Sequence, residues 1–141
     1  MTYEVQPLPF KPHRLEGLSD RLLISHYETN YGGAVRRLNA IERRLEQTDW
    51  AGLAVFDLNG LGRERLIATN SMMLHKAYFE ALGGTGQPEG HVAQALEREF
   101  GSVDRWPVEF SLMGEAPAGD PGWVDHCHTV SDGAVVLALD M

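Results

Sequence analysis

The sequence predicts an α+β fold, with an N-terminal antiparallel helical hairpin followed by a smaller helical lobe with a short antiparallel sheet. Three observations lead to this prediction: two long segments with helical spacing of apolar residues, a glycine-rich break after them, and one strand-like run near the end of the chain. We therefore expect a helical-hairpin domain at residues 1–84 and a C-terminal α/β domain at residues 85–141.

The first helix is expected to run from Ser19 to about Gln47. Ser19 is a suitable N-cap because its hydroxyl can accept a hydrogen bond from a backbone N–H of the first turn. The Gly32-Gly33 pair disfavours a helix by up to about 1 kcal/mol per glycine relative to alanine, so we expect a bend there. The apolar residues of this segment recur at intervals of three and four: Leu23, Tyr27, Tyr31, Ala34, Val35, Leu38, Ile41 and Leu45.

The second helix is expected from roughly Arg63 to Leu82, after a looser stretch that contains Gly52, Asn59-Gly60 and Gly62. Gly83-Gly84 marks its end. Two long helices joined by a modest connection favour an antiparallel hairpin whose apolar stripes face each other. The apolar positions of the second helix include Leu66, Ile67, Met72, Met73, Tyr78, Phe79 and Leu82.

The smaller lobe begins after the glycine-rich break at residues 83–90. A third helix is predicted for His91 to Phe100, and Ser102 can cap a fourth that begins at Val103. The run at residues 134–139 is continuously apolar, which indicates a buried strand.

Composition excludes several classes of protein. The formal net charge of −8 is spread along the chain without a basic stripe, so we expect no nucleic-acid partner. No apolar stretch approaches the roughly 18 to 20 residues of a membrane helix, and residues 1–12 lack the pattern of a secretion signal. Cys127 is the only cysteine, so no intrachain disulfide can form, and we expect a cytoplasmic protein.

Two histidines and one aspartate are candidates for chemistry. His26 and His75 each lie about midway along one helix of the predicted hairpin, where burial costs free energy unless both ring nitrogens are satisfied. Metal ligation by one nitrogen is one solution, and an ordinary hydrogen-bonded or surface histidine is the other. Asp140 follows the predicted strand and is open to the same two interpretations, since an aspartate near a chain end can simply face water.

A series of short motifs occurs in one order along the chain and resembles the iron/manganese superoxide dismutase family. His26 stands twelve residues before Leu38-Asn39, as in that family's first ligand helix, and Asn70 precedes His75-Lys76-Ala77-Tyr78-Phe79, as in its second. Further matching segments are Tyr3 to Phe10, Phe100-Gly101-Ser102-Val103, Gly122-Trp123-Val124 and Val136-Leu137-Ala138-Leu139-Asp140.

The resemblance implies a superoxide dismutase with an iron or manganese ion bound by His26, His75 and Asp140. Two imidazoles and a carboxylate suit these metals better than softer ones. In the family the metal alternates between two oxidation states while superoxide is converted to oxygen and hydrogen peroxide. The resemblance further implies a homodimer and places the metal ligand Asp140 in the C-terminal domain.

The sequence departs from the family pattern at several positions. The family's gateway tyrosine is Ala34 here, and Tyr31, one helical turn earlier, is the candidate to replace it. The glutamine that lies just outside the family's metal ligands has His126 as its candidate substitute. After its aspartate the family continues to a Glu-His-Ala-Tyr that supplies the last ligand, whereas here only Met141 follows, so the domain at residues 85–141 is expected to be incomplete. The family also has more residues between its Gly-Trp and the segment that starts at Asp125, so a missing segment before Asp125 is a further hypothesis.

Two alternative functions remain open from the sequence. A degenerate family member would keep the fold for a structural or binding role with little or no activity, and both Ala34 and the unmatched last ligand favour it. A second alternative is an iron enzyme with two histidines and one carboxylate that uses open coordination positions for oxygen chemistry.

Overall fold

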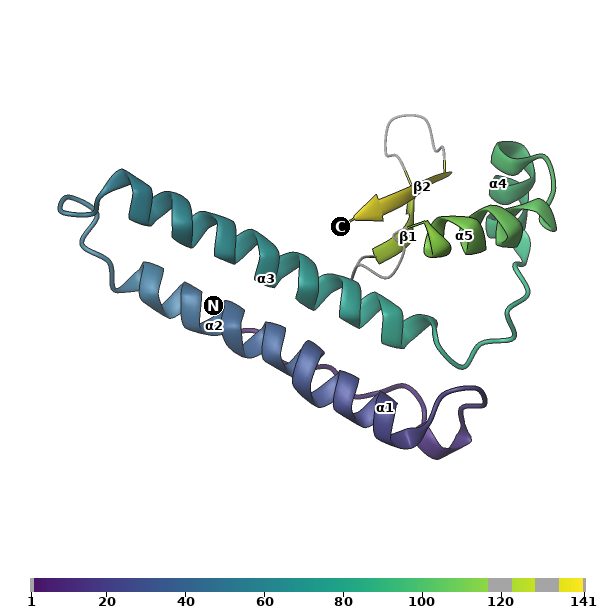
Figure 1. Cartoon of the computed structure of the whole chain (residues 1–141), viewed down its shortest axis with the longest axis horizontal. Helices are drawn as coiled ribbons and strands as arrows, with labels where there is room; N and C mark the ends of the chain where they lie inside the picture. Colours follow the sequence, from purple (N-terminus) through teal and green to yellow (C-terminus); the bar gives the residue numbers. More distant parts are fainter. Residues whose placement is uncertain (1, 117–122, 129–134, 141) are drawn as a thin grey trace. The chain divides into compact units, whose positions relative to one another are not determined.

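The computed structural model describes residues 2–116, 123–128 and 135–140, with the backbone alone for 124–128 and 135–140 (Figure 1). The chain forms two compact units, residues 1–84 and residues 85–141. The described part of the chain is mostly helical, as the sequence predicts, and none of its helices combines the length and the apolar character needed to cross a membrane.

The first unit is a helical hairpin. Its first arm is a continuous helical run of α1 (Asp20–Ser25), the π-helix η2 (His26–Tyr31) and α2 (Gly32–Glu46). Its second arm is α3 (Val55–Ala81), which lies antiparallel beside α2 (Figure 1). A short 3-10 helix, η1 (Pro12–Arg14), precedes α1. The predicted cap is confirmed, because the Ser19 hydroxyl accepts a hydrogen bond from the Leu22 N–H at 3.3 Å.

The start of the second helix was predicted too late. We expected it at Arg63, but α3 begins at Val55 and includes Asn59, Gly60 and Gly62. A glycine costs a helix only about 1 kcal/mol, and extending an existing helix gains one hydrogen bond for each residue fixed. The glycines therefore do not end a helix that continues for many turns beyond them.

The irregularity expected at Gly32-Gly33 has a different form. Both glycines lie inside α2, and the departure from α-helical geometry is the π-helix at His26–Tyr31 directly before them. π-helical segments are rare and often occur at functional sites. No residue type in this segment specified its geometry in advance.

The core of the hairpin lies along the inner faces of the two arms. One buried cluster joins the first arm to α3 near the π-helix, and a second joins α2 to α3 closer to the connecting loop. The members of the first cluster are Leu23, Tyr31, Val35 and Phe79, and those of the second are Leu38, Ile41 and Ala68. Most of these residues belong to the apolar stripe predicted from the sequence.

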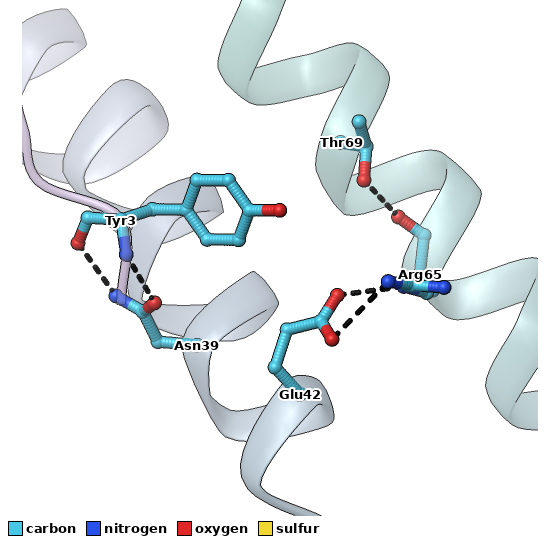
Figure 2. A network of polar contacts seen from close by, with 5 residues as sticks. All are labelled: Tyr3, Asn39, Glu42, Arg65 and Thr69. Atoms are coloured by element: carbon cyan, nitrogen blue, oxygen red, sulfur yellow. Dashed lines mark hydrogen bonds and ion pairs between the residues drawn. The ribbon is translucent and has the colours of Figure 1, made fainter. Parts of the chain in front are cut away.

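The N-terminal segment is attached to the hairpin by its backbone. The Asn39 side chain accepts a hydrogen bond from the Tyr3 N–H at 2.8 Å and donates one to the Tyr3 carbonyl at 2.9 Å (Figure 2). Nearby, the Arg65 guanidinium of α3 donates to both carboxylate oxygens of Glu42 on α2, at 2.6 and 3.2 Å (Figure 2). The two arms and the N-terminal segment are thus joined by polar contacts as well as by the core.

The second unit contains α4 (Gly90–Phe100), α5 (Arg105–Glu115) and the antiparallel strands β1 (Trp123–His128) and β2 (Val135–Asp140). In the register of the two strands, Trp123 pairs with Asp140 and His126 pairs with Leu137. α4 ends at Phe100, and the Gly101 that follows it has a φ of +81°, the left-handed conformation that glycine adopts readily. The next helix begins at Arg105 with Asp104 as its N-cap, two residues later than the predicted start at Val103. Ser102 still accepts a hydrogen bond from the Arg105 N–H at 3.2 Å, although it is not the N-cap residue.

Replacing Asn39 by alanine should destabilise the hairpin by about 1 to 3 kcal/mol. The change removes both hydrogen bonds to Tyr3 and leaves a partly buried N–H and carbonyl without their partner. Urea unfolding measures the loss, and Asn59→Ala, at an exposed position of α3, is the matched control with an expected change within about 0.5 kcal/mol. Equal effects of the two substitutions would contradict this role for Asn39.

Candidate metal centre

The structure brings the two predicted histidine ligands together. His26 is the first residue of the π-helix, His75 lies in the last third of α3, and their ring centroids are 5.0 Å apart with the rings nearly perpendicular. The two arms of the hairpin supply one imidazole each. This is the juxtaposition expected from the placement of both histidines midway along the predicted helices.

The protonation of His75 is set by its own helix. The ring is buried, with 6% of the residue exposed, and its Nδ1 lies 2.6 Å from the Ser71 carbonyl and 3.3 Å from the Ser71 hydroxyl. A carbonyl oxygen only accepts, so Nδ1 carries the proton and the lone pair of the neutral ring is on Nε2. Histidines that bind metals commonly donate their other N–H to a backbone carbonyl in this way.

His26 is held among aromatic rings. Its ring centroid is 5.2 Å from that of Tyr78 and 5.5 Å from that of Phe79, in addition to its contact with His75. Burial lowers the pKa of His26 below 6.5, and the neighbouring His75 lowers it further. The neutral imidazole is therefore favoured, and it is this form that binds metal ions.

Tyr31 lies against the other side of this pair. Its ring is stacked on that of His75 with 6.5 Å between centroids, and only 2% of the residue is exposed. Its hydroxyl accepts a hydrogen bond from the Gln6 N–H at 3.2 Å, while the Tyr27 hydroxyl donates to the Gln6 carbonyl at 2.8 Å. Accepting a hydrogen bond does not use the phenolic hydrogen, so Tyr31 keeps a proton that it can donate.

The remaining predicted site residues belong to the second unit. The structure describes the backbone of His126 in β1 and of Asp140 in β2, and their side chains lie outside the described residues. Within the described side chains, no group of three or more His, Cys, Asp or Glu residues could hold a metal ion. The roles of Asp140 as ligand and of His126 therefore stay predictions.

Sequence reasoning missed the supporting residues of the two histidines. The Ser71 carbonyl comes four residues before His75, and Phe79 comes four residues after it, the spacing at which helical neighbours meet. That spacing in the sequence could have predicted both residues. No sequence pattern could have predicted the contacts of Tyr27 and Tyr31 with the Gln6 backbone, because they depend on how the N-terminal segment returns along the hairpin.

The hairpin and its paired imidazoles place this chain among proteins in which two antiparallel helices bring a pair of histidines together. Comparison with known proteins agrees with this class. The chain is 51% identical, over its full length and 80% of the relative's, to a superoxide dismutase [Fe] of Cupriavidus metallidurans. It is 30% identical to a superoxide dismutase [Fe] of Saccharolobus solfataricus and 33% identical to a superoxide dismutase [Mn] 2 of Haloferax volcanii, over 86% and 84% of this chain. No family model matches the chain.

The chain belongs to the iron/manganese superoxide dismutase family. It spans 60% of the length of the Saccharolobus relative and 61% of that of the Haloferax relative. The alignment with the Cupriavidus protein extends over 158 residues, more than the 141 of this chain, so that relative has additional residues within the aligned region.

The lowered pKa of His26 predicts a loss of stability of the metal-free protein below pH 6.5. The unfolded chain takes up the proton at the usual pKa while the folded chain resists it, so the free energy of unfolding falls as the pH decreases from 7 through 6.5. The loss ends once the pH lies below the pKa of His26 in the folded state. Urea unfolding at pH 7 and pH 5.5 measures it, and His26→Gln should lose less stability between these two values. An identical loss in both proteins would show that His26 does not contribute.

Proposed function

We propose that this protein is a superoxide dismutase that converts superoxide to oxygen and hydrogen peroxide at a mononuclear iron or manganese centre. Membership of the family and the names of the relatives, which include both iron and manganese dismutases, support the activity and the metal. The observation that carries the proposal is the 5.0 Å apposition of His26 and His75, each supplied by one arm of the hairpin.

The residues present fit such a metal. The Nδ1–H of His75 is directed to the Ser71 carbonyl, a contact common among metal-binding histidines, and the lowered pKa of His26 favours its neutral form, which is the form that binds metal ions. We assign His26, His75 and Asp140 as the protein's ligands, with Asp140 supplied by the second unit. When bound, the metal supplies the one-electron oxidation and reduction that dismutation of two superoxide ions requires.

The surrounding residues position the ligands and handle protons. The Ser71 carbonyl fixes the orientation of His75, and the rings of Tyr78 and Phe79 limit the movement of His26 and shield it from water. Peroxide formation consumes protons, and the Tyr31 hydroxyl is the phenol that we assign as a donor in this region. His126 is assigned to the place of the family's glutamine, which lies just outside the metal ligands.

The degenerate alternative would keep this hairpin without metal or activity. Its main support is Ala34, which lacks a phenol and is buried, with 7% of the residue exposed. The phenol of Tyr31 beside His75 and the dismutase names of the relatives favour the active form. The metal content of the purified protein separates the two, because only the active form requires bound iron or manganese.

Other properties of the whole protein follow from the same proposal. We propose a cytoplasmic homodimer of the α+β class that acts on superoxide and has neither a nucleic-acid nor a membrane partner. The net charge of −8 supports the absence of a nucleic-acid partner. We also propose that residues 85–141 form the α/β domain that completes the metal site through Asp140.

Removing either imidazole should abolish metal retention and activity. His26→Ala and His75→Ala each take one ligand from the proposed site, which should weaken iron or manganese binding by at least about 100-fold. Metal analysis of the full-length chain together with a dismutase assay measures both effects. His91→Ala, at an exposed position of α4, is the matched control and should keep metal and activity. Unchanged metal content in the first two variants would refute the ligand assignment.

Replacing Tyr31 by phenylalanine tests the phenol separately from the ring. The variant keeps the packing against His75 but loses the hydrogen bond from the Gln6 N–H, which should cost about 1 kcal/mol of stability. If the hydroxyl donates a proton, kcat should fall by about 10²-fold or more while metal content stays the same. Tyr27→Phe is the control, since it loses the other hydrogen bond to Gln6 with kcat preserved. Full activity in Tyr31→Phe would remove this residue from the mechanism.

A further inference from the structure

The π-helix places two residues of the first arm beside His75. His26 and Tyr31 are five residues apart, and both of their rings contact the His75 ring, at 5.0 and 6.5 Å between centroids. In an α-helix, residues five apart point about 140° away from each other. In a π-helix the hydrogen bonds connect residues five apart, so these residues lie nearly above one another. The contact of Tyr31 with His75 therefore depends on the π register.

A side chain from outside the π-helix forms a hydrogen bond with its backbone. Arg36, one turn into α2, donates from Nη2 to the Glu28 carbonyl at 3.3 Å. The other terminal nitrogen of its guanidinium lies 3.0 Å from the position that a Cβ on Gly32 would occupy. The guanidinium thus lies directly against the space that the missing side chain of Gly32 leaves beside the π segment.

The need for such a contact follows from the geometry of the segment. A π-helix is seldom adopted, and here it continues directly into the α-helical α2 at Gly32. A hydrogen bond from a charged donor to a carbonyl is stronger than one between neutral groups. The Arg36 contact joins the second turn of α2 to the middle of the π segment, across the point where the helix geometry changes.

We propose that Arg36 is a positioning residue that maintains the π register through the Glu28 carbonyl, from beside the space left by Gly32, and so holds Tyr31 against His75. Its effect on dismutation rests on the proposed function. Its effect on the position of Tyr31 does not rest on that function. The Gln6 N–H donates a hydrogen bond to the Tyr31 hydroxyl, so the Gln6 amide reports the position of Tyr31 separately.

The experiment compares the exchange of two backbone amides in the full-length, metal-free chain by NMR. The Gln6 amide is bound to Tyr31 and the Tyr3 amide is bound to Asn39, and both lie in the same N-terminal segment. In Arg36→Ala, the Gln6 amide should exchange about fivefold faster while the Tyr3 amide is unchanged, since only the first depends on the π register. Gly32→Ala should shift the guanidinium only by a few tenths of an ångström, so its effect on the Gln6 amide should be smaller and in the same direction.

Two further variants complete the test. Arg36→Lys keeps a charged donor at this position and should restore part of the protection of Gln6, whereas Arg43→Ala removes a cation from the exposed face of the same helix and should change neither amide. General destabilisation would accelerate both amides together, and that outcome overturns the proposal. An unchanged Gln6 amide in Arg36→Ala overturns it as well, whether or not the protein proves to be a dismutase.

Discussion

The packing of the π-helix against α3 is the contact on which the candidate site depends. It brings the ring centroids of His26 and His75 to 5.0 Å from each other. The same packing forms the core cluster of Leu23, Tyr31, Val35 and Phe79. His75 is buried and His26 is half-buried, and burying an imidazole is costly unless its nitrogens are satisfied. One nitrogen of His75 is satisfied by its own helix through the Ser71 carbonyl, so the helix itself fixes the orientation of this ring beside His26.

The hairpin itself could be predicted because its determinants are local. The apolar stripe, the Ser19 cap and the glycines after α3 each act within a few residues, and the placement of both histidines on that stripe predicted that they would meet. The start of α3 was missed because Gly60 and Gly62 disfavour a helix too weakly to outweigh its cooperativity. Local signals therefore located the helices better than they located this boundary.

The π-helix could not be predicted from sequence, because its hydrogen bonding differs from that of an α-helix by one residue per turn and no residue type specifies it. Its support comes from contacts that appear only after folding, such as those of Arg36 with Glu28 and of Tyr31 with Gln6. Asp140 and His126 belong to the second unit, and their roles rest on the family resemblance. The sequence thus predicted the candidate histidines of the site, but it did not predict the π-helical geometry with which the first arm orients its side chains.

The same geometry bears on the position where this chain departs most clearly from its family. The resemblance places a tyrosine at position 34, and this chain has a buried alanine there. The π segment instead turns Tyr31 toward His75, where its ring stacks on the imidazole and its hydroxyl is held by the N-terminal backbone. This chain therefore keeps a buried phenol in contact with the His75 ring, although position 34 supplies none.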